Sequence, residues 1–184
     1  PVVHAYGRGH IAYLPLLAGR EIMACDYYGF PAGMVESGYP PETFRRRPGG
    51  MERFMRLHGV THAITFRDNY IEHFRNHPED YEEVAVFRDP LEQRHNVYTV
   101  FKVRDSGGRF REGAGSVQAG FNRLTVTLDD PGVPRAAIAY NWDERLSAAP
   151  PAQIEPVEVE PGVVFIGIRP NGAKTINIHY RSRF

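Results

Sequence analysis

The sequence predicts an α+β protein: an N-terminal α/β subdomain over residues 1–105, a linker or long loop over residues 106–120, and a small antiparallel β-sandwich over residues 121–184. Helix-like and strand-like patterns alternate in the first part, whereas the last part carries only short runs of the strand type. Five glycines fall between Asp105 and Gly120, with no sustained hydrophobic period. Such a stretch is typical of a loop between two structural units.

The first predicted helix begins near Gly49. Met51, Phe54 and Met55 recur at helical spacing, and Gly59 can adopt the left-handed conformation that ends many helices. We therefore expect a helix of about ten residues before Gly59.

A strand and a second helix are predicted to follow. Residues 60–66 are rich in β-branched and aromatic side chains, which favour an extended strand. Asp68 and Asn69, together with Glu72, form a candidate capping box for a helix that runs toward His77.

Two extended runs, residues 82–88 and 96–104, come next. In the second run, Val97, Thr99 and Phe101 alternate with the intervening side chains, which is the pattern of a half-buried strand. The two runs are predicted to pair as a hairpin.

Five short strands are predicted in the last part of the chain. They cover residues 124–128, 135–141, 154–159, 163–168 and 175–180. The turn Pro170-Asn171-Gly172 predicts a tight hairpin between the last two, because Asn-Gly tolerates the positive φ values that such turns require.

Composition argues against several classes of function. Lys plus Arg and Asp plus Glu are equal at 22 each, so no net charge attracts nucleic acid to the chain. A hydrophobic content of 42% over 184 residues is sufficient for a buried core. No apolar run approaches the roughly 20 residues that span a bilayer, so we expect the chain as given to be soluble. The single cysteine excludes an internal disulfide.

Several segments resemble the extramembrane C-terminal domain of YfhO-type bacterial membrane proteins. In the last part of the chain these are Phe121-Asn122-Arg123-Leu124-Thr125-Val126, Tyr140-Asn141-Trp142, Gly162-Val163-Val164-Phe165 and Lys174-Thr175-Ile176-Asn177-Ile178-His179-Tyr180. In the first part they are Leu14-Pro15-Leu16-Leu17-Ala18-Gly19-Arg20-Glu21 and Leu57-His58-Gly59-Val60-Thr61-His62-Ala63-Ile64. The order of these segments along the chain carries the resemblance.

The resemblance implies a function in a membrane protein. YfhO-type proteins are similar to GT-C glycosyltransferases, which have many transmembrane helices and use polyprenyl-phosphate-linked sugars as donors. The chain begins at Pro1 and stops at Phe184, just after a strand-like run, so we expect it to be a segment of a larger protein. It would then be an extracytoplasmic domain, attached to the membrane through helices outside the segment. Catalytic residues of such an enzyme would lie in the membrane part, so none is assigned here, and no cofactor is implied.

One polar cluster in the sequence is suited to bind a saccharide or a lipid phosphate. Arg20 can grip a phosphate or carboxylate with two hydrogen bonds, and the carboxylate of Asp26 can accept sugar hydroxyls. The rings of Tyr27 and Tyr28 offer flat faces on which a pyranose can stack. The alternative is that Arg20 pairs with a nearby carboxylate while the tyrosines fill the boundary between the two halves.

Trp142 and Asp143 have the same two interpretations. They are either a second ligand-binding position or a core tryptophan that anchors a turn of the sandwich.

Histidine and cysteine residues predict no metal or nucleophilic site. His58 and His62 are separated by Gly59, where a helix is expected to become a strand, so they would not share a helical face. His73 and His77 can lie on the same side of a helix, but no third ligand is evident. Cys25 has no activating base beside it in the sequence and is expected to be a buried structural thiol.

Three functions from different classes follow. The first is a non-catalytic domain that helps a GT-C-like membrane protein to position a lipid-linked sugar donor or a glycan acceptor. The second is a free-standing carbohydrate-binding module, and the third is a structural interaction domain without a ligand. An independent enzyme ranks last, because no nucleophile, base and orienting group can be assembled from the sequence.

Overall fold

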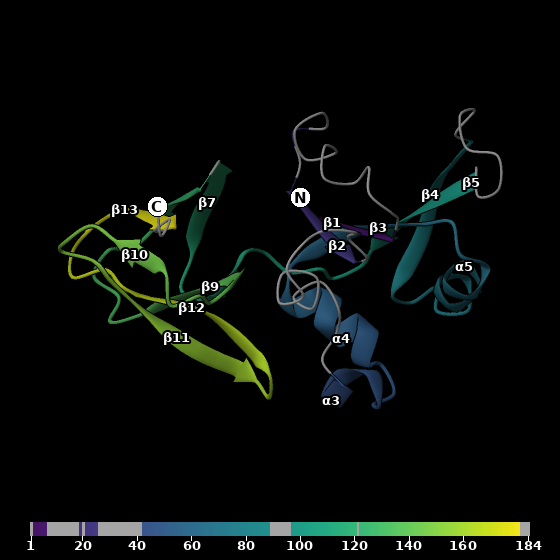
Figure 1. The fold of residues 1–184 in the computed structure, drawn as a ribbon, viewed down its shortest axis with the longest axis horizontal. Helices are drawn as coiled ribbons and strands as arrows, with labels where there is room; N and C mark the ends of the chain where they lie inside the picture. Colours follow the sequence, from purple (N-terminus) through teal and green to yellow (C-terminus); the bar gives the residue numbers. More distant parts are fainter. Residues whose placement is uncertain are drawn as a thin grey trace. The chain divides into compact units, whose positions relative to one another are not determined.

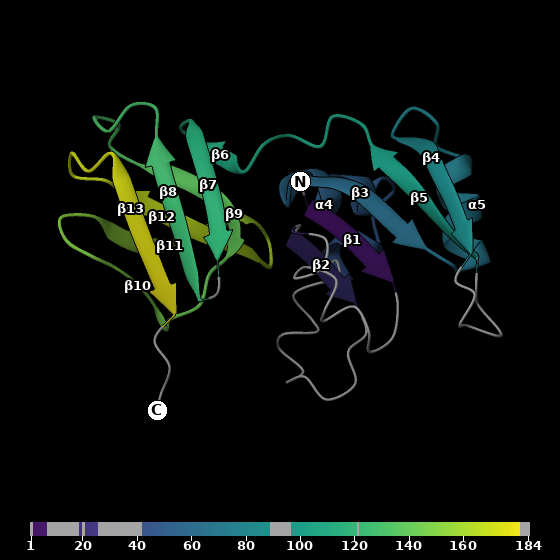
Figure 2. The ribbon, with the colours of Figure 1, turned by 90° about the horizontal axis from the view of Figure 1, so that it is seen from above.

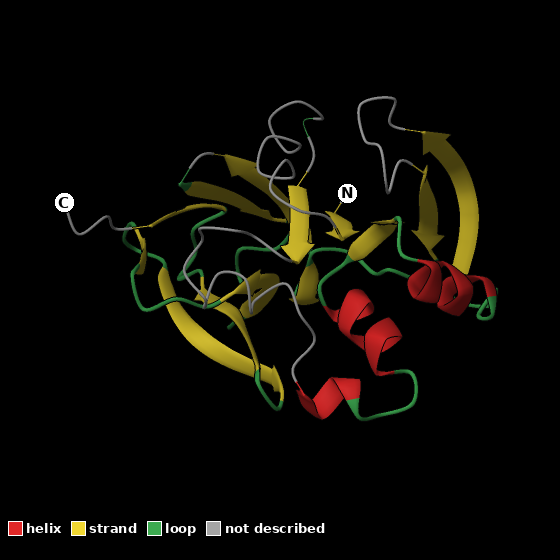
Figure 3. Ribbon diagram, turned by 45° about the vertical axis from the view of Figure 1, so that its right-hand side comes forward, coloured by secondary structure: helices red, strands yellow, loops and turns green. Residues whose placement is uncertain are grey.

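The computed structural model describes residues 2–6, 19, 21–25, 42–88, 97–120 and 122–180. The chain divides into two compact units, Pro1–Gly107 and Gly108–Phe184 (Figure 1). Strands dominate both, and the helices of the described residues all lie in the first unit (Figure 3). The predicted α+β class is therefore confirmed, with β-structure in the majority.

The first unit contains one five-stranded mixed sheet with the strand order β2-β1-β3-β5-β4 (Figure 2). Its strands are β1 (Val2–Tyr6), β2 (Glu21–Cys25), β3 (Val60–Thr65), β4 (Tyr81–Arg88) and β5 (Val97–Val103). Strand β1 pairs in parallel with β2 and with β3, whereas β3–β5 and β4–β5 are antiparallel. The predicted hairpin over residues 82–104 is confirmed as β4 and β5.

Three helices accompany this sheet: α3 (Glu42–Arg45), α4 (Gly50–Leu57) and α5 (Asp68–Arg75). Helices α4 and α5 contribute to one apolar core, whose buried members are Met55, Val60, Ala63, Phe74, Tyr81, Phe101 and Val103. Gly59 has a φ of 61° and its amide donates to the carbonyl oxygen of Arg56, so it ends α4 as the sequence predicts.

The predicted capping box of α5 is wrong. The helix begins at Asp68, and the residue before it, Arg67, makes no side-chain cap. Asp68 is already in the first turn, where its negative charge lies at the positive end of the helix dipole. The hydroxyl of Thr65 accepts the hydrogen bond from the backbone N–H of Arg67 and fixes the entry into the helix.

Replacing Gly50 by alanine is expected to destabilise the first unit. A Cβ at this position would lie 1.9 Å from the backbone carbonyl oxygen of Phe44. Alanine is the better helix former by about 1 kcal/mol, but overpacking against a rigid backbone typically costs about 1–3 kcal/mol. We therefore expect a lower midpoint of thermal unfolding in far-UV circular dichroism. In Gly120→Ala the nearest atom is 3.8 Å away, so this control is expected to unfold close to wild type, and an unchanged midpoint in Gly50→Ala would contradict the close contact.

The second unit consists of two four-stranded antiparallel sheets, with the orders β10-β13-β8-β7 and β11-β12-β9-β6. The strands are β6 (Phe110–Glu112), β7 (Gly115–Gly120), β8 (Arg123–Leu128), β9 (Ala136–Asn141), β10 (Leu146–Ala148), β11 (Gln153–Glu160), β12 (Val163–Arg169) and β13 (Thr175–Tyr180). The five predicted strands are confirmed as β8, β9, β11, β12 and β13.

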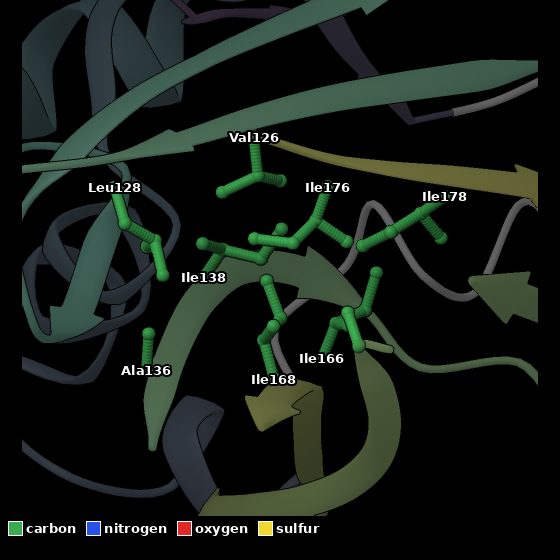
Figure 4. Close-up of a cluster of buried hydrophobic side chains, with 9 residues drawn as sticks. Val126, Leu128, Ala136, Ile138, Ile166, Ile168, Ile176 and Ile178 are labelled. Carbon is green, nitrogen blue, oxygen red and sulfur yellow. The ribbon is translucent and has the colours of Figure 1, made fainter. Parts of the chain in front are cut away.

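One apolar cluster joins the two sheets. Alternate residues of β8 and β13 meet alternate residues of β9 and β12, and the labelled side chains point toward one another in Figure 4. The members drawn from these four strands are Val126, Leu128, Ala136, Ile138, Ile166, Ile168, Ile176 and Ile178. This period of two is what the sequence pattern predicts.

The linker predicted over residues 106–120 is wrong for most of its length, because β6 and β7 occupy residues 110–112 and 115–120. One of its glycines, Gly115, serves close packing in the sheet. Gly115 has a φ of 152°, and a Cβ there would lie 2.1 Å from the carbonyl oxygen of Thr127 on the neighbouring strand. Only glycine allows the two backbones to approach so closely.

The hairpin predicted at Pro170-Asn171-Gly172 is also wrong. The turn itself forms: φ is 49° at Asn171 and 85° at Gly172, and the amide of Ala173 donates to the carbonyl oxygen of Pro170 at 2.9 Å. However, β12 and β13 belong to different sheets. The backbone carbonyl oxygen of the next residue, Lys174, accepts a hydrogen bond from the amide of Leu128 on β8. This bond places β13 beside β8.

Candidate functional site

Trp142 lies directly after β9 and packs against the apolar cluster of the second unit. Its backbone N–H donates to the carbonyl oxygen of Val164 at 2.9 Å, which continues the pairing with β12 by one residue. The indole is half-buried. This position suits an aromatic side chain that anchors the turn and keeps part of its ring accessible.

Asp143 is held by Arg145. Its Oδ1 accepts hydrogen bonds from the backbone N–H and from Nε of Arg145, and its Oδ2 accepts one from Nη2 at 2.7 Å. The hydrogen bonds from Arg145 lower the pKa of Asp143 and outweigh the partial burial that raises it. The guanidinium of Arg145 also lies 4.5 Å from the ring centroid of Tyr180. The carboxylate is therefore ionised and both its oxygens already have donors.

The other predicted ligand-binding residues are Arg20, Asp26, Tyr27 and Tyr28, and all four lie outside the described residues.

A polar cluster that the sequence did not predict lies in the first unit, between α4, α5 and β4. Glu52 is 4% exposed. Its Oε1 lies 2.8 Å from Nε2 of His73 and accepts a hydrogen bond from the hydroxyl of Tyr81 at 3.2 Å. One buried carboxylate oxygen thus connects two helices with a strand of the sheet.

Electrostatics keep this cluster in a defined protonation state. Burial acts to raise the pKa of Glu52, but hydrogen bonds from its own backbone, His73 and Tyr81, together with the charge on His73, outweigh burial and lower it. Burial and the negative charge of Glu52 raise the pKa of the Tyr81 phenol. Glu52 is therefore an ionised acceptor and Tyr81 a neutral donor.

The cluster extends toward the surface through His77 and Asp80. The His73 and His77 rings are 4.4 Å apart, but α5 ends at Arg75 and His77 lies just beyond it, so the predicted helix does not extend to His77. Nδ1 of His77 donates to the backbone carbonyl of His73, and this bond, with smaller contributions from Glu52 and Asp80, raises the pKa of His77. Asp80 forms an ion pair with Arg56 on α4.

His58 and His62 take separate positions in the first unit. His58 caps the end of α4 and its Nδ1 lies 3.0 Å from the carbonyl oxygen of Phe54, while His62 is on β3. As the sequence predicts, His58 and His62 do not share a helical face. In the part of the chain that the structure describes, no three His, Cys, Asp or Glu residues are placed to hold a metal ion.

This arrangement favours a structural role for Glu52, His73 and Tyr81. A carboxylate that orients a histidine is a common element of acid–base sites. In this cluster, however, the same carboxylate oxygen also accepts the phenol of a buried tyrosine that stays protonated. The contacts tie α4, α5 and β4 together across the edge of the core.

A helix of membrane-spanning length and hydropathy is not found within the described ranges. Comparison of the chain with models of protein families, with curated proteins and with solved structures found no match.

Proposed function

We propose that this chain is a non-catalytic, extracytoplasmic domain of a GT-C-like membrane glycosyltransferase, and that it helps to position a polyprenyl-phosphate-linked sugar donor or a glycan acceptor. The membrane attachment and the catalytic centre of this protein would lie outside the segment. We further propose that Gly108–Phe184 is a single β-sandwich whose two sheets are closed around the one apolar cluster.

One observation carries the proposal: five of the six segments that resemble YfhO-type proteins coincide, in order, with structural joints and core strands, while the segment over residues 14–21 lies largely outside the described residues. Leu57–Ile64 spans the end of α4, the left-handed Gly59 and the start of β3. The four segments in the last part of the chain fall on β8, β9, β12 and β13, which supply most of the buried cluster of the second unit. A resemblance of short apolar segments gains weight when each segment has a defined place in a common architecture.

The contacts of Trp142 and Asp143 favour this role over a free-standing carbohydrate-binding module. A sugar platform needs an aromatic face and polar groups with unused hydrogen-bonding capacity. Trp142 instead packs against the core, and both oxygens of Asp143 accept hydrogen bonds from Arg145.

The test is deletion of this segment from the full-length protein in its membrane. Sugar transfer from a polyprenyl-phosphate-linked donor is expected to fall while the amount of membrane-inserted protein stays the same. A Trp142→Ala variant of the full-length protein serves as a second probe, because it loosens one turn without removing the segment. Unchanged transfer after deletion would refute the proposal.

A further inference from the structure

Two imidazole rings, those of His73 and His77, lie against each other beside the Glu52 cluster. His73 is on α5, and His77 follows shortly after the helix ends at Arg75. The ring centroids are 4.4 Å apart and the ring planes are inclined by 40°. Neutral imidazole is the commonest ligand of transition metals in proteins, so two rings at this spacing could chelate one ion.

One nitrogen of each ring is fixed by a hydrogen-bond acceptor. Nε2 of His73 lies 2.8 Å from Oε1 of Glu52, and because this carboxylate is ionised, the ring donates to it. Nδ1 of His77 donates to the backbone carbonyl oxygen of His73 at 2.8 Å. Histidines that bind metals almost always donate their other N–H to a carboxylate, a backbone carbonyl or water. Both rings have this arrangement, which leaves the lone pairs on Nδ1 of His73 and Nε2 of His77.

These two nitrogens can be reached from solvent. Neither of them makes a hydrogen bond to the described residues, since the bonds of both rings use the other nitrogen. In the part of the chain that the structure describes, the one side-chain nitrogen or oxygen that is buried without a partner is Nε of Arg111. Nδ1 of His73 and Nε2 of His77 therefore keep contact with solvent. The side chain of His73 is 36% exposed, although its Nε2 faces a buried carboxylate.

The spacing of the rings matches a chelate on an ion of tetragonal geometry. Imidazole nitrogens bind such metals at about 2.0–2.1 Å. Two imidazoles at a right angle on one ion then have ring centres about 4.5 Å apart, and at a tetrahedral angle about 5 Å. The observed 4.4 Å agrees with the right angle. Among the metals that imidazole suits, Cu²⁺ and Ni²⁺ prefer the tetragonal geometry.

The surrounding charges favour a cation at this position. The pKa of His77 is raised by its backbone hydrogen bond and, against slight burial, by the negative charges of Glu52, Glu79 and Asp80. Asp80 is also paired with Arg56, which offsets part of this negative charge. The remaining field attracts a positive ion to the rings.

We propose that Nδ1 of His73 and Nε2 of His77 chelate a divalent ion of the Cu²⁺ or Ni²⁺ type. Glu52 is the positioning residue, because it orients the ring of His73 through Nε2. No third histidine, cysteine or carboxylate joins the pair within the described residues, so water completes the coordination. The site is independent of the proposed function, since it requires no membrane part.

The experiment is a titration of the folded chain with Cu²⁺ at mildly alkaline pH, in a buffer that does not bind copper. It is followed by NMR of the imidazole ring protons, because the paramagnetic ion broadens the signals of the rings that bind it. The signals are assigned by their loss in His73→Asn and His77→Asn. In wild type both signals are expected to broaden together below one equivalent of Cu²⁺. The electron paramagnetic resonance spectrum should show coupling to two imidazole nitrogens.

The variants separate a chelate from two independent histidines. In His77→Asn, the His73 signal is expected to broaden only at a free Cu²⁺ concentration at least about tenfold higher, because one of the two ligands is lost. This variant keeps the contact between His73 and Glu52, and its fold is checked by far-UV circular dichroism. His179→Asn is the matched control and should leave the chelate unchanged.

His179 also supplies the reference for a single histidine. It is exposed on β13, and its neighbours on the adjacent strands are Arg123 and Ser147. The chelate is refuted if the His73 and His77 signals of the folded chain broaden at no lower Cu²⁺ concentration than the His179 signal. Unchanged broadening of His73 in His77→Asn would refute it as well.

Discussion

Replacing Ile166 by alanine is expected to destabilise the second unit by about 3 kcal/mol. Ile166 is 1% exposed at the centre of β12, where it pairs with Ile138 of β9 and with Pro156 of β11. It contributes to the cluster that joins the two sheets (Figure 4). The truncation removes buried apolar contacts and leaves a cavity between sheets that are each fixed by their own hydrogen-bond ladders, so the site can collapse only in part.

The loss of stability is measured by urea unfolding, and the chain contains an intrinsic fluorescent probe for it. Trp142 is the one tryptophan of the sequence and packs against the same cluster, so its emission during urea unfolding reports on the second unit. The matched control is Ile154→Ala on β11, because Ile154 is only partly buried at the margin of the cluster. Its expected loss is about 1 kcal/mol. Equal unfolding midpoints for Ile166→Ala and wild type would show that the two sheets do not share this core.

The strands of this core could be predicted from sequence because their signal is local. Val126 and Leu128 on β8, like Ile176 and Ile178 on β13, are two residues apart, and a period of two needs no knowledge of the partner strand. The strand with which each of them pairs could not be predicted from such a local pattern. Asn171 and Gly172 fix the backbone of a four-residue turn, whereas the sheet that β13 joins depends on Lys174 and its hydrogen bond to Leu128, which is remote in sequence.

Other strands were not predicted, either because glycines bound them or because they are very short. Gly115 and Gly120 begin and end β7, and in a sequence they indicate a loop. The strands β6 and β10 have three residues each, too few to show an alternation. The parallel pairs of β1 depend on β2 and β3, which lie apart along the chain, so no turn signal could reveal them.

The polar cluster around Glu52 escaped prediction for a similar reason. On a helix that also carries Met51 and Phe54, a glutamate is usually a solvated side chain. A signal was present, since Glu52 lies three residues before the buried Met55 and therefore on the same helical face. Its partners His73 and Tyr81 come from other elements, and only the fold brings them together.

Replacing Glu52 by leucine is expected to destabilise the first unit by about 2–3 kcal/mol. Leucine fills most of the volume but removes the acceptor for the phenol of Tyr81, which is 3% exposed, and for the ring of His73. Glu52→Gln keeps an oxygen in place and should lose less. The loss is measured by urea unfolding with far-UV circular dichroism, which reports on the helices of this unit. The matched control is Glu72→Leu, an exposed position on α5, and it should unfold close to wild type.

The contribution of the Glu52 charge has a defined pH dependence. Its pKa in the folded chain lies below the ordinary value of 4.5, so the unfolded chain binds the proton more readily. The stabilisation is therefore fully present above about pH 5 and is lost as the pH falls through the lowered folded pKa. The difference in unfolding free energy between wild type and Glu52→Gln should be constant near neutral pH and shrink on acidification to about pH 3. A difference that stays constant over this whole range would mean that the carboxylate acts through shape and not through its charge.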